Sequence, residues 1–293
     1  MELAQKILWA GVAMLAFLLG LCLFSLPDGK LHVFVLDIGQ GDSILIQLPT
    51  DERILIDGGP DNSVLNELGK VMPFYEKNID LVILSHPHLD HVNGLVEVLK
   101  RYRVGAVMMT GVSYNYSGYA AFLEQVTQQH LPVVYGGAKF SNGRGVDYRL
   151  GTVILDMIFP FDSEQGRTFE NQNNGSIVFR LLYGKKSFYF PGDLEMEGEE
   201  KLVASNLNLH ADFLKAPHHG SRTSDTVPLL ERIQPQYAAI SCGVNNKFGH
   251  PHAITLQHFQ ERHIATYRTD LDGIIEAVSD GDRLWVKAWG KNS

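Results

Sequence analysis

The stretch LSHPHLDH, residues 84–91, decides the fold of this chain. It places three histidines and one aspartate within six residues, directly after the apolar run 79–84. That run has the length and composition of a buried strand, and residues 92–101 carry apolar side chains at helical spacing. The cluster is therefore predicted on a short turn from a strand to a helix, where side chains can converge instead of alternating.

Imidazoles and a carboxylate are the ligands of a borderline divalent cation, with zinc first and manganese or iron next. His86, His88, Asp90 and His91 are therefore candidate metal ligands. A polar loop that is rich in histidine by chance is the competing interpretation. Because the chain has only 12 histidines in 293 residues, so dense a group favours a metal site.

Length and charge limit the class of protein. With 293 residues and 45% hydrophobic content, the chain can bury a large core, as one α/β domain or as two packed halves. A formal net charge of −8 argues against a broadly basic surface for nucleic acid, although it permits a local cationic groove. Cys22 and Cys242 lie far apart in the sequence, so no disulfide framework is predicted.

The N-terminal stretch 7–26 is uncharged and almost wholly apolar, which predicts a transmembrane helix. A cleaved signal peptide is the alternative, but its apolar core would be shorter, about 7–15 residues, and a small-residue cleavage site would follow. We therefore expect an uncleaved single-pass membrane anchor within residues 1–30 and a separate domain at 31–293. Lys6 favours an N-terminus inside the cell and this domain on the extracytoplasmic side.

Strand-like and helix-like segments alternate along the rest of the chain, which predicts a layered α/β fold. The first three strands, 31–38, 43–48 and 53–57, are expected to form an antiparallel meander. The other strands are expected at 104–109, 133–134, 152–159, 177–183, 187–190, 211–216 and 237–241. Helices are expected near 63–76, 92–101, 117–129, 195–205 and 254–262.

The pattern His86-x-His88-x-Asp90-His91 after an apolar strand resembles the signature of the metallo-β-lactamase superfamily. The resemblance implies a four-layer αβ/βα sandwich with two divalent metal ions at its edge. By the same resemblance, His86 and His88 would bind one metal, and Asp90 and His91 the other.

The resemblance also assigns roles to residues at later strand ends. Asp193 follows the strand 187–190 and would bridge the two metals, whereas a helix-capping aspartate is the alternative. Asp57 would orient the metal loop from beneath, with a plain turn residue as the alternative. Of the adjacent histidines after 211–216, we predict His218 as a metal ligand and His219 as a substrate-facing residue. No physical argument excludes the reverse assignment.

One ligand of the superfamily pattern is missing. The superfamily takes a third histidine for the first metal from the middle of the chain, and between His91 and Asp193 only His130 is available, at the end of a predicted helix. In its place stands the amide-rich stretch 171–176, in which we expect Asn174 to support the site. Because amides suit harder cations better than zinc, manganese is the second candidate metal after zinc.

Two further segments are predicted to contact the substrate. Residues 220–224 offer hydroxyls, backbone amides and the guanidinium of Arg222 before a predicted helix, a combination that suits an anion such as phosphate. A solvated surface residue is the alternative for Arg222. His250 resembles a loop histidine that lies over the active site.

Several motifs narrow the resemblance to one branch, the metallohydrolase domain of DNA-internalisation competence proteins of the ComEC type. They are found at 37–43, 57–59, 85–94, 174–176, 192–193, 218–221, 249–252 and 267–270. The resemblance runs from about residue 31 to about residue 286. The transporters of that branch carry many membrane spans, so the resemblance implies a hydrolase and not DNA transport by this chain.

The predicted function is that of a metal-dependent hydrolase with a metal-bound hydroxide as the attacking group. By resemblance, the expected substrate is a phosphodiester, with single-stranded DNA as the candidate. A lactonase or β-lactamase-type acyl hydrolase is one alternative, and a catalytically inactive, membrane-tethered binding module is another. No Ser/His/Asp pattern competes with the metal site.

Overall fold

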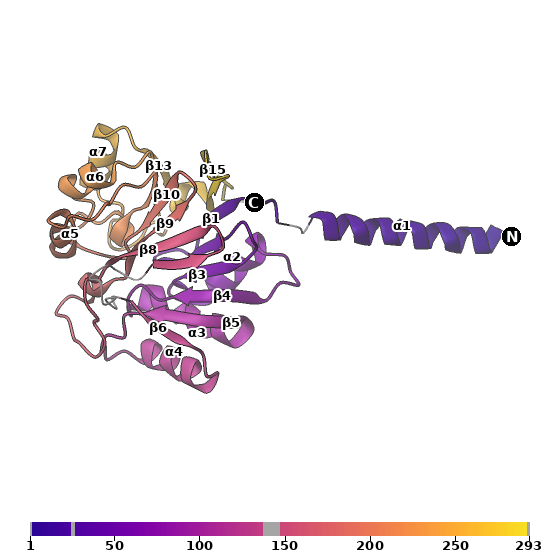
Figure 1. Cartoon of the computed structure of the whole chain (residues 1–293), viewed down its shortest axis with the longest axis horizontal. Coiled ribbons are helices and arrows are strands. Elements are labelled where there is room, and N and C mark those ends of the chain that lie inside the picture. Colours follow the sequence, from indigo (N-terminus) through magenta and orange to yellow (C-terminus); the bar gives the residue numbers. More distant parts are fainter. Residues whose placement is uncertain (1, 25–26, 137–146, 292–293) are drawn as a thin grey trace.

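Two sheets pack face to face, and each carries helices on its outer face, so that the chain forms a four-layer sandwich (Figure 1). The computed structural model describes residues 2–24, 27–136 and 147–291. The α/β sandwich expected from the metal motif and from the alternation of strands and helices is therefore confirmed.

The first sheet has eight strands in the order β15-β14-β1-β2-β3-β4-β5-β6. They are β1 (Leu31–Val35), β2 (Ile44–Gln47), β3 (Arg53–Ile56), β4 (Asn78–Ile83), β5 (Arg103–Met109), β6 (Val133–Tyr135), β14 (Ile275–Ser279) and β15 (Leu284–Ala288). Pairing is antiparallel from β15 to β3, which includes the predicted meander, and parallel from β3 to β6.

The second sheet has seven strands in the order β13-β12-β11-β10-β9-β8-β7. They are β7 (Asp147–Leu150), β8 (Val153–Phe159), β9 (Val178–Tyr183), β10 (Lys186–Phe190), β11 (Phe213–Lys215), β12 (Tyr237–Ile240) and β13 (Ala265–Arg268). Its strands are antiparallel from β7 to β10 and parallel from β10 to β13. Each sheet thus has one parallel half, whose carboxyl ends carry the polar residues described below.

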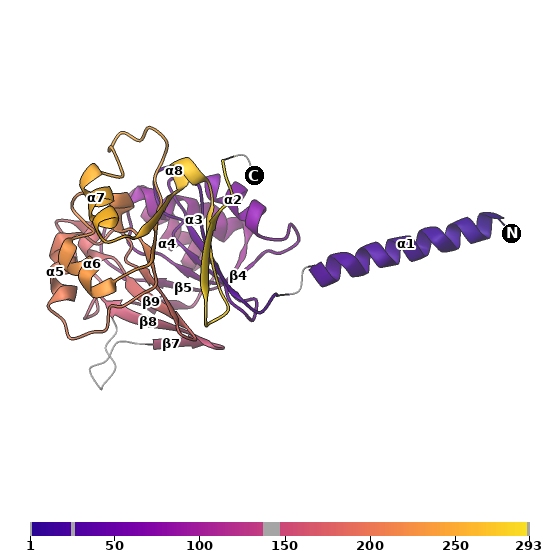
Figure 2. The ribbon, with the colours of Figure 1, turned by 90° about the horizontal axis from the view of Figure 1, so that it is seen from above.

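Three apolar interfaces hold the four layers together. In β1, Val33 and Val35 face the second sheet, whereas Phe34 faces the helices, because successive strand residues point to opposite faces. The first sheet is covered by α2 (Ser63–Val71), α3 (Leu89–Arg101) and α4 (Ser117–Gln128). The second sheet is covered by α5 (Met196–Val203), α6 (Val227–Ile233) and α7 (Ala253–Glu261) (Figure 2). The short helix α8 (Thr269–Asp272) follows β13.

The N-terminal helix α1 (Glu2–Phe24) extends away from the sandwich (Figures 1 and 2). No helix within 2–24, 27–136 or 147–291 combines the length and the apolar character that crossing a bilayer requires. The prediction of a single-pass anchor through 7–26 is therefore wrong, and the extracytoplasmic placement that rested on it loses its basis. The observed helix starts at Glu2 and ends at Phe24, and residues 25 and 26 lie outside the described residues.

One helix is shorter than its sequence pattern predicted. A helix was expected over 63–76, but α2 ends at Val71. Met72 is already extended, with φ −108° and ψ 145°, because Pro73 disfavours helical geometry in the residue before it.

Candidate metal centre

The candidate site lies where the parallel halves of the two sheets meet. His86 and His88 lie between the end of β4 and the start of α3, and Asp90 and His91 lie in the first turn of α3. Asp193 follows β10 on the opposite sheet. The structure brings these residues, which lie up to about a hundred positions apart, into direct contact, since His91 Nε2 is 3.2 Å from Asp193 Oδ2.

Four of the converging groups offer ligand atoms within 4.8 Å of one another: Asp90, His91, Asp193 and His219. Asp193 Oδ2 lies at the centre, 3.2 Å from His91 Nε2 and 3.4 Å from His219 Nε2. His219 Nε2 is also 3.4 Å from Asp90 Oδ2. A cluster of two imidazoles and two carboxylates is a donor set suited to a divalent cation.

His86 and His88 form a second pair beside this cluster. Their facing nitrogens, Nε2 of His86 and Nδ1 of His88, are 3.1 Å apart, and His86 Nε2 is 4.0 Å from Asp193 Oδ2. Asp193 therefore lies between the two groups of histidines, as a residue shared by two sites would.

The structure exchanges the predicted places of the adjacent histidines His218 and His219. His219 is buried in the cluster, whereas His218 points toward Glu195, 3.3 Å away, and its side chain is 24% exposed. Both residues have left-handed backbones, with φ 47° and 56°, in the tight turn η2 (Pro217–Gly220). This turn reverses which imidazole faces inward, and strand alternation could not show it.

The ring nitrogens on the far side of the cluster are held by the protein. His91 Nδ1 lies 2.8 Å from Asp57 Oδ2, and His219 Nδ1 lies 3.0 Å from the carbonyl oxygen of Ser241. When Nδ1 donates to these oxygens, Nε2 of each ring faces Asp193 with its lone pair. Fixing the outer nitrogen in this way is a common means of orienting a histidine ligand.

Asp57 lies beneath the metal loop, at the end of β3. Its carboxylate accepts hydrogen bonds from the backbone N–H and the hydroxyl of Ser85, at 2.8 and 2.6 Å. The start of α3 packs tightly against the same segment, because a Cβ on Gly94 would collide with the carbonyl oxygen of Gly58. The glycine therefore permits the close approach that brings His91 over Asp57.

Sequence analysis missed a buried ion pair that supports His219. Lys215 Nζ donates to Asp42 Oδ2 at 2.7 Å, and Asp42 Oδ1 lies 3.3 Å from His219 Nδ1. Both charged side chains are almost fully buried. A lysine within the apolar strand 211–216 was the available signal, because a buried lysine needs a charged partner.

Two neighbouring asparagine side chains of η1 (Gln172–Gly175) make different contacts. Asn174, the residue predicted to support the site, instead accepts backbone hydrogen bonds from Glu195 and Gly198 and so holds the start of α5. Its neighbour Asn173 lies beside His88 and donates to Glu195 at 2.6 Å. Among the described residues, the buried Oδ1 of Asn173 has no hydrogen-bond partner.

The predicted substrate-facing residues border the cluster on one side. The His250 ring lies 6.0 Å from that of His219 and 5.5 Å from that of His218, measured between centroids. Arg222 is exposed, and its backbone N–H donates to His252 Nδ1 at 3.1 Å. A group of imidazoles with an exposed guanidinium nearby is thus present beside the cluster.

A model of the family described as the Metallo-beta-lactamase superfamily matches residues 36–244, well over half of the chain. The chain belongs to this superfamily. The matched range includes the His86–His91 motif, Asp193 and His219, so the cluster lies in the part of the chain that the family shares.

Two curated relatives of this superfamily member are competence proteins by name. It is 30% identical to ComE operon protein 3 of Bacillus subtilis (strain 168), over 94% of this chain and 36% of the relative. It is 28% identical to Competence protein ComA of Neisseria gonorrhoeae, over 86% of this chain and 33% of the relative. The resemblance to the ComEC-type branch is confirmed, and the chain spans about a third of the length of these relatives.

Among solved structures, a β-hydroxylase mutant, CmlA E377D, shares the fold. It superimposes with a TM-score of 0.51 at 12% identity, covering 86% of this chain and 54% of the other. Identity at this level supports the common fold alone.

Electrostatics in the metallo-β-lactamase site favour an added positive charge. Burial would lower the pKa of His91 and His219, but Asp193, helped by Asp57 and Asp42 respectively, raises the pKa of both imidazoles well above the usual value. Burial would raise the pKa of the Asp193 carboxyl, yet His219 and His91 hold it well below its ordinary value. The neighbouring carboxylates thus stabilise a positive charge at these two rings, carried either by a proton or by a bound metal cation.

The pKa of His86 is shifted in the opposite direction to those of His91 and His219. Burial, with the charge of His91 next to it, lowers the pKa of His86 well below the usual value, so that the ring is neutral. A neutral imidazole is the form that binds a metal.

Unsatisfied polar atoms show that the residues fit a metal ion. Oδ1 of Asp193 and Nε2 of His219 are buried and have no hydrogen-bond partner within the described part of the chain. A buried polar atom without a partner costs about 1–3 kcal/mol, so two of them in one ligand cluster would be costly without a further bonding partner. The His and Asp cluster can therefore hold metal, as expected for the superfamily.

Proposed function

We propose that this chain is a metal-dependent phosphodiester hydrolase whose site holds two divalent cations. The observation that carries the proposal is the central carboxylate of Asp193, which lies between two groups of histidines and has one buried oxygen without a partner. Asp193 would contact both cations. The competence relatives and the anion-binding groups beside the cluster support a phosphodiester as the substrate, with single-stranded DNA as the candidate.

The protein offers different ligands to each cation. His86 and His88 would hold the first, and Asp90, His91 and His219 the second. The first site has fewer strong ligands, with the Asn173 amide at its edge, so we propose that it accepts manganese as well as zinc. Bound divalent cations supply activation of water near neutral pH and neutralise charge on phosphoryl oxygens.

His250 is suited to donate a hydrogen bond to the substrate. Burial and the nearby His219 lower its pKa to about 4, so the ring is neutral at pH 7. Its Nδ1 lies 3.5 Å from the amide nitrogen of Gln40, which can donate to it and leave the proton on Nε2. That N–H can stabilise negative charge developing on a phosphoryl oxygen, and the exposed guanidinium of Arg222 can add positive charge nearby.

A substrate panel tests this function. Purified chain supplied with zinc or manganese should hydrolyse bis(p-nitrophenyl) phosphate faster than nitrocefin or a lactone, and Asp193→Ala should abolish the activity. The control Asp280→Ala changes an aspartate on the distant turn between β14 and β15 and should leave it unaltered. Faster hydrolysis of β-lactams or lactones would point to an acyl hydrolase, and no hydrolysis of any substrate to an inactive binding module.

A further inference from the structure

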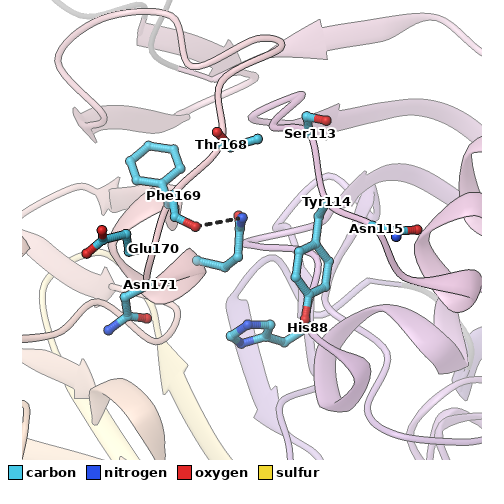
Figure 3. Close-up of a pocket in the computed structure, with 9 residues that line it drawn as sticks. His88, Ser113, Tyr114, Asn115, Thr168, Phe169, Glu170 and Asn171 are labelled. Atoms are coloured by element: carbon cyan, nitrogen blue, oxygen red, sulfur yellow. Dashed lines mark hydrogen bonds between the residues drawn. The ribbon is translucent and has the colours of Figure 1, made fainter.

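A cleft of about 450 Å³ opens beside the metal centre, at His88 (Figure 3). His88 forms part of its wall, so the cleft begins at one of the candidate ligands of the first cation. The remaining wall comes from two segments, the 113–115 loop before α4 and residues 168–172, which lead into the first residue of η1. Neither loop contributes to the metal cluster itself.

Two aromatic side chains line the cleft from opposite loops. Figure 3 shows Tyr114 on one side and Phe169 on the other, with His88 below them. The Tyr114 ring meets the His88 ring edge-on at 5.5 Å between centroids, and His88 in turn meets His86 at 4.7 Å. A ring bound between the two aromatic residues would therefore lie directly next to the first metal site.

The residues that line the cleft favour a neutral group over a phosphate. Of the nine described residues that line it, none is a lysine or an arginine, and Glu170 brings a negative charge. The exposed cation Arg222 instead lies near His250, because its backbone N–H donates to His252, whose ring contacts that of His250. The two flanks of the metal centre thus differ, with one suited to phosphate and the other to an uncharged planar ring.

The aromatic wall is held in place by its surroundings. The Arg167 guanidinium lies over the Phe169 ring at 5.4 Å from the centroid, and the side-chain amide of Gln172 donates to the Phe169 carbonyl at 3.4 Å. Tyr114 packs partly against the helix-side core, next to Tyr116, whose hydroxyl donates to Asn93 at 2.8 Å. Rings fixed in this way lose little conformational entropy when they bind a partner.

We propose that this cleft binds one unpaired nucleobase of the substrate, next to the scissile phosphodiester. The proposal rests on the function proposed above and specifies its substrate class. Stacking on aromatic rings recognises every base by its flat face, and a base can enter such a cleft only when it is not paired. The cleft is large enough for a nucleoside, within the usual volume range of ligand pockets. Single strands should therefore be cut in preference to blunt duplex DNA.

The test compares two single-stranded oligonucleotides of thymidine, one intact and one with a tetrahydrofuran abasic residue in place of a single nucleoside. The wild-type chain, loaded with manganese, should cleave beside the intact base with a kcat/KM higher by about 5- to 150-fold, the range that base–aromatic stacking provides. Tyr114→Leu and Phe169→Leu should each bring the ratio between the two substrates toward one. Tyr114→Phe keeps the ring and should keep the ratio.

Tyr75→Leu is the matched control, because Tyr75 is an exposed tyrosine far from the cleft, in the loop after α2, and its loss should leave the ratio unchanged. The proposal is overturned if the wild type does not distinguish the two oligonucleotides, or if both leucine variants retain the full ratio. In either case phosphodiester hydrolysis itself would still stand.

If no phosphodiester is hydrolysed at all, the proposed function fails, and binding then tests the cleft separately. Fluorescence anisotropy of the same labelled oligonucleotides should show tighter binding of the intact strand, and Tyr114→Leu and Phe169→Leu should remove the difference. Equal affinity of the wild type for both strands would overturn the nucleobase site.

Discussion

Two adjacent histidines on one turn have opposite environments. His219 is buried against Asp193, while His218 is partly exposed and paired with Glu195. Positive φ angles at both residues set these directions. The pair therefore provides its own matched control, because each variant removes one imidazole from the same turn.

His219→Ala should weaken metal binding by at least about 100-fold, since removing a ligand costs more than the 10–100-fold typical of residues that only orient ligands. His218→Ala should keep wild-type metal content. Elemental analysis of the two purified variants after dialysis measures the difference. Metal loss in His218→Ala together with retention in His219→Ala would restore the assignment made from the sequence.

His250→Ala should lower kcat on phosphodiesters by about 10²–10³-fold, the usual cost of losing one donor to the charge developing in the transition state. Metal content should not change, because His250 lies outside the four-residue cluster. His130→Ala, which removes an exposed imidazole at the end of α4, is the control. Wild-type turnover in the His250 variant would exclude this residue from the chemistry.

The local sequence pattern was sufficient to predict the positions of some site residues but not of others. The His86–His91 motif and Asp193 follow apolar strands, and their convergence could be predicted from sequence. Their roles as ligands remain predictions. The exchange of His218 and His219 depends on backbone angles, and the different contacts of Asn173 and Asn174 depend on how η1 meets α5. No periodicity in the sequence encodes either.

At the scale of elements, a buried ion pair joins the two sheets. Lys215 on β11 of the second sheet donates to Asp42 in the loop between β1 and β2 of the first. Burial would raise the pKa of the Asp42 carboxyl, but Lys215 and His219 outweigh it and lower that pKa. The pair therefore remains charged inside the protein.

Lys215→Met should lower the free energy of unfolding by about 3–5 kcal/mol, because it removes the cation that donates to the buried carboxylate of Asp42 and leaves only His219 to compensate that charge. The double variant Asp42→Asn/Lys215→Met removes both charges and should recover part of this loss. Urea unfolding followed by circular dichroism measures both. A loss below about 1 kcal/mol in the single variant would show that water reaches Asp42.

A second polar contact ties β1 to β14 and makes stability depend on pH. Burial would raise the pKa of Glu276, but hydrogen bonds from His32, Lys287 and Trp289 lower it to about 2. A carboxyl whose folded pKa is depressed contributes stability above its unfolded pKa, about 4.3, and the contribution disappears as the pH falls toward 2.

Glu276→Gln should therefore cost about 2–3 kcal/mol at pH 7 and flatten the loss of stability between pH 4.5 and 2. Urea midpoints measured over this range, with a chelator present, test the effect. Glu200→Gln, an exposed change on α5, is the control and should leave the curve as in the wild type. A Glu276 variant that loses stability between pH 4.5 and 2 as steeply as the wild type would contradict the account.

Element type was more predictable than element boundaries. The layered fold could be predicted from the alternation of strands and helices, because the spacing of apolar residues along the chain differs between these two kinds of element. The end of α2 was misplaced by several residues, although Pro73 was visible in the sequence. Hydropathy over 7–26 suggested a membrane span that no described helix supports.

At the scale of the whole molecule, the site exists only when the two halves are packed together. One half supplies the histidine motif and Asp57, and the other supplies Asp193 and His219. The buried pair of Asp42 and Lys215 crosses the same boundary. Sequence could indicate each half, but the relative positions of their ligands follow from long-range packing of both sheets.

The central claim is that this site binds divalent metal and hydrolyses phosphodiesters with it. The most direct test is to strip the purified chain with a chelator and then follow phosphodiester hydrolysis while zinc or manganese is added back. The account predicts no turnover after stripping and recovery on addition of the cation in the wild type but not in Asp193→Ala. Full turnover by the stripped protein, or none with either metal, would contradict it.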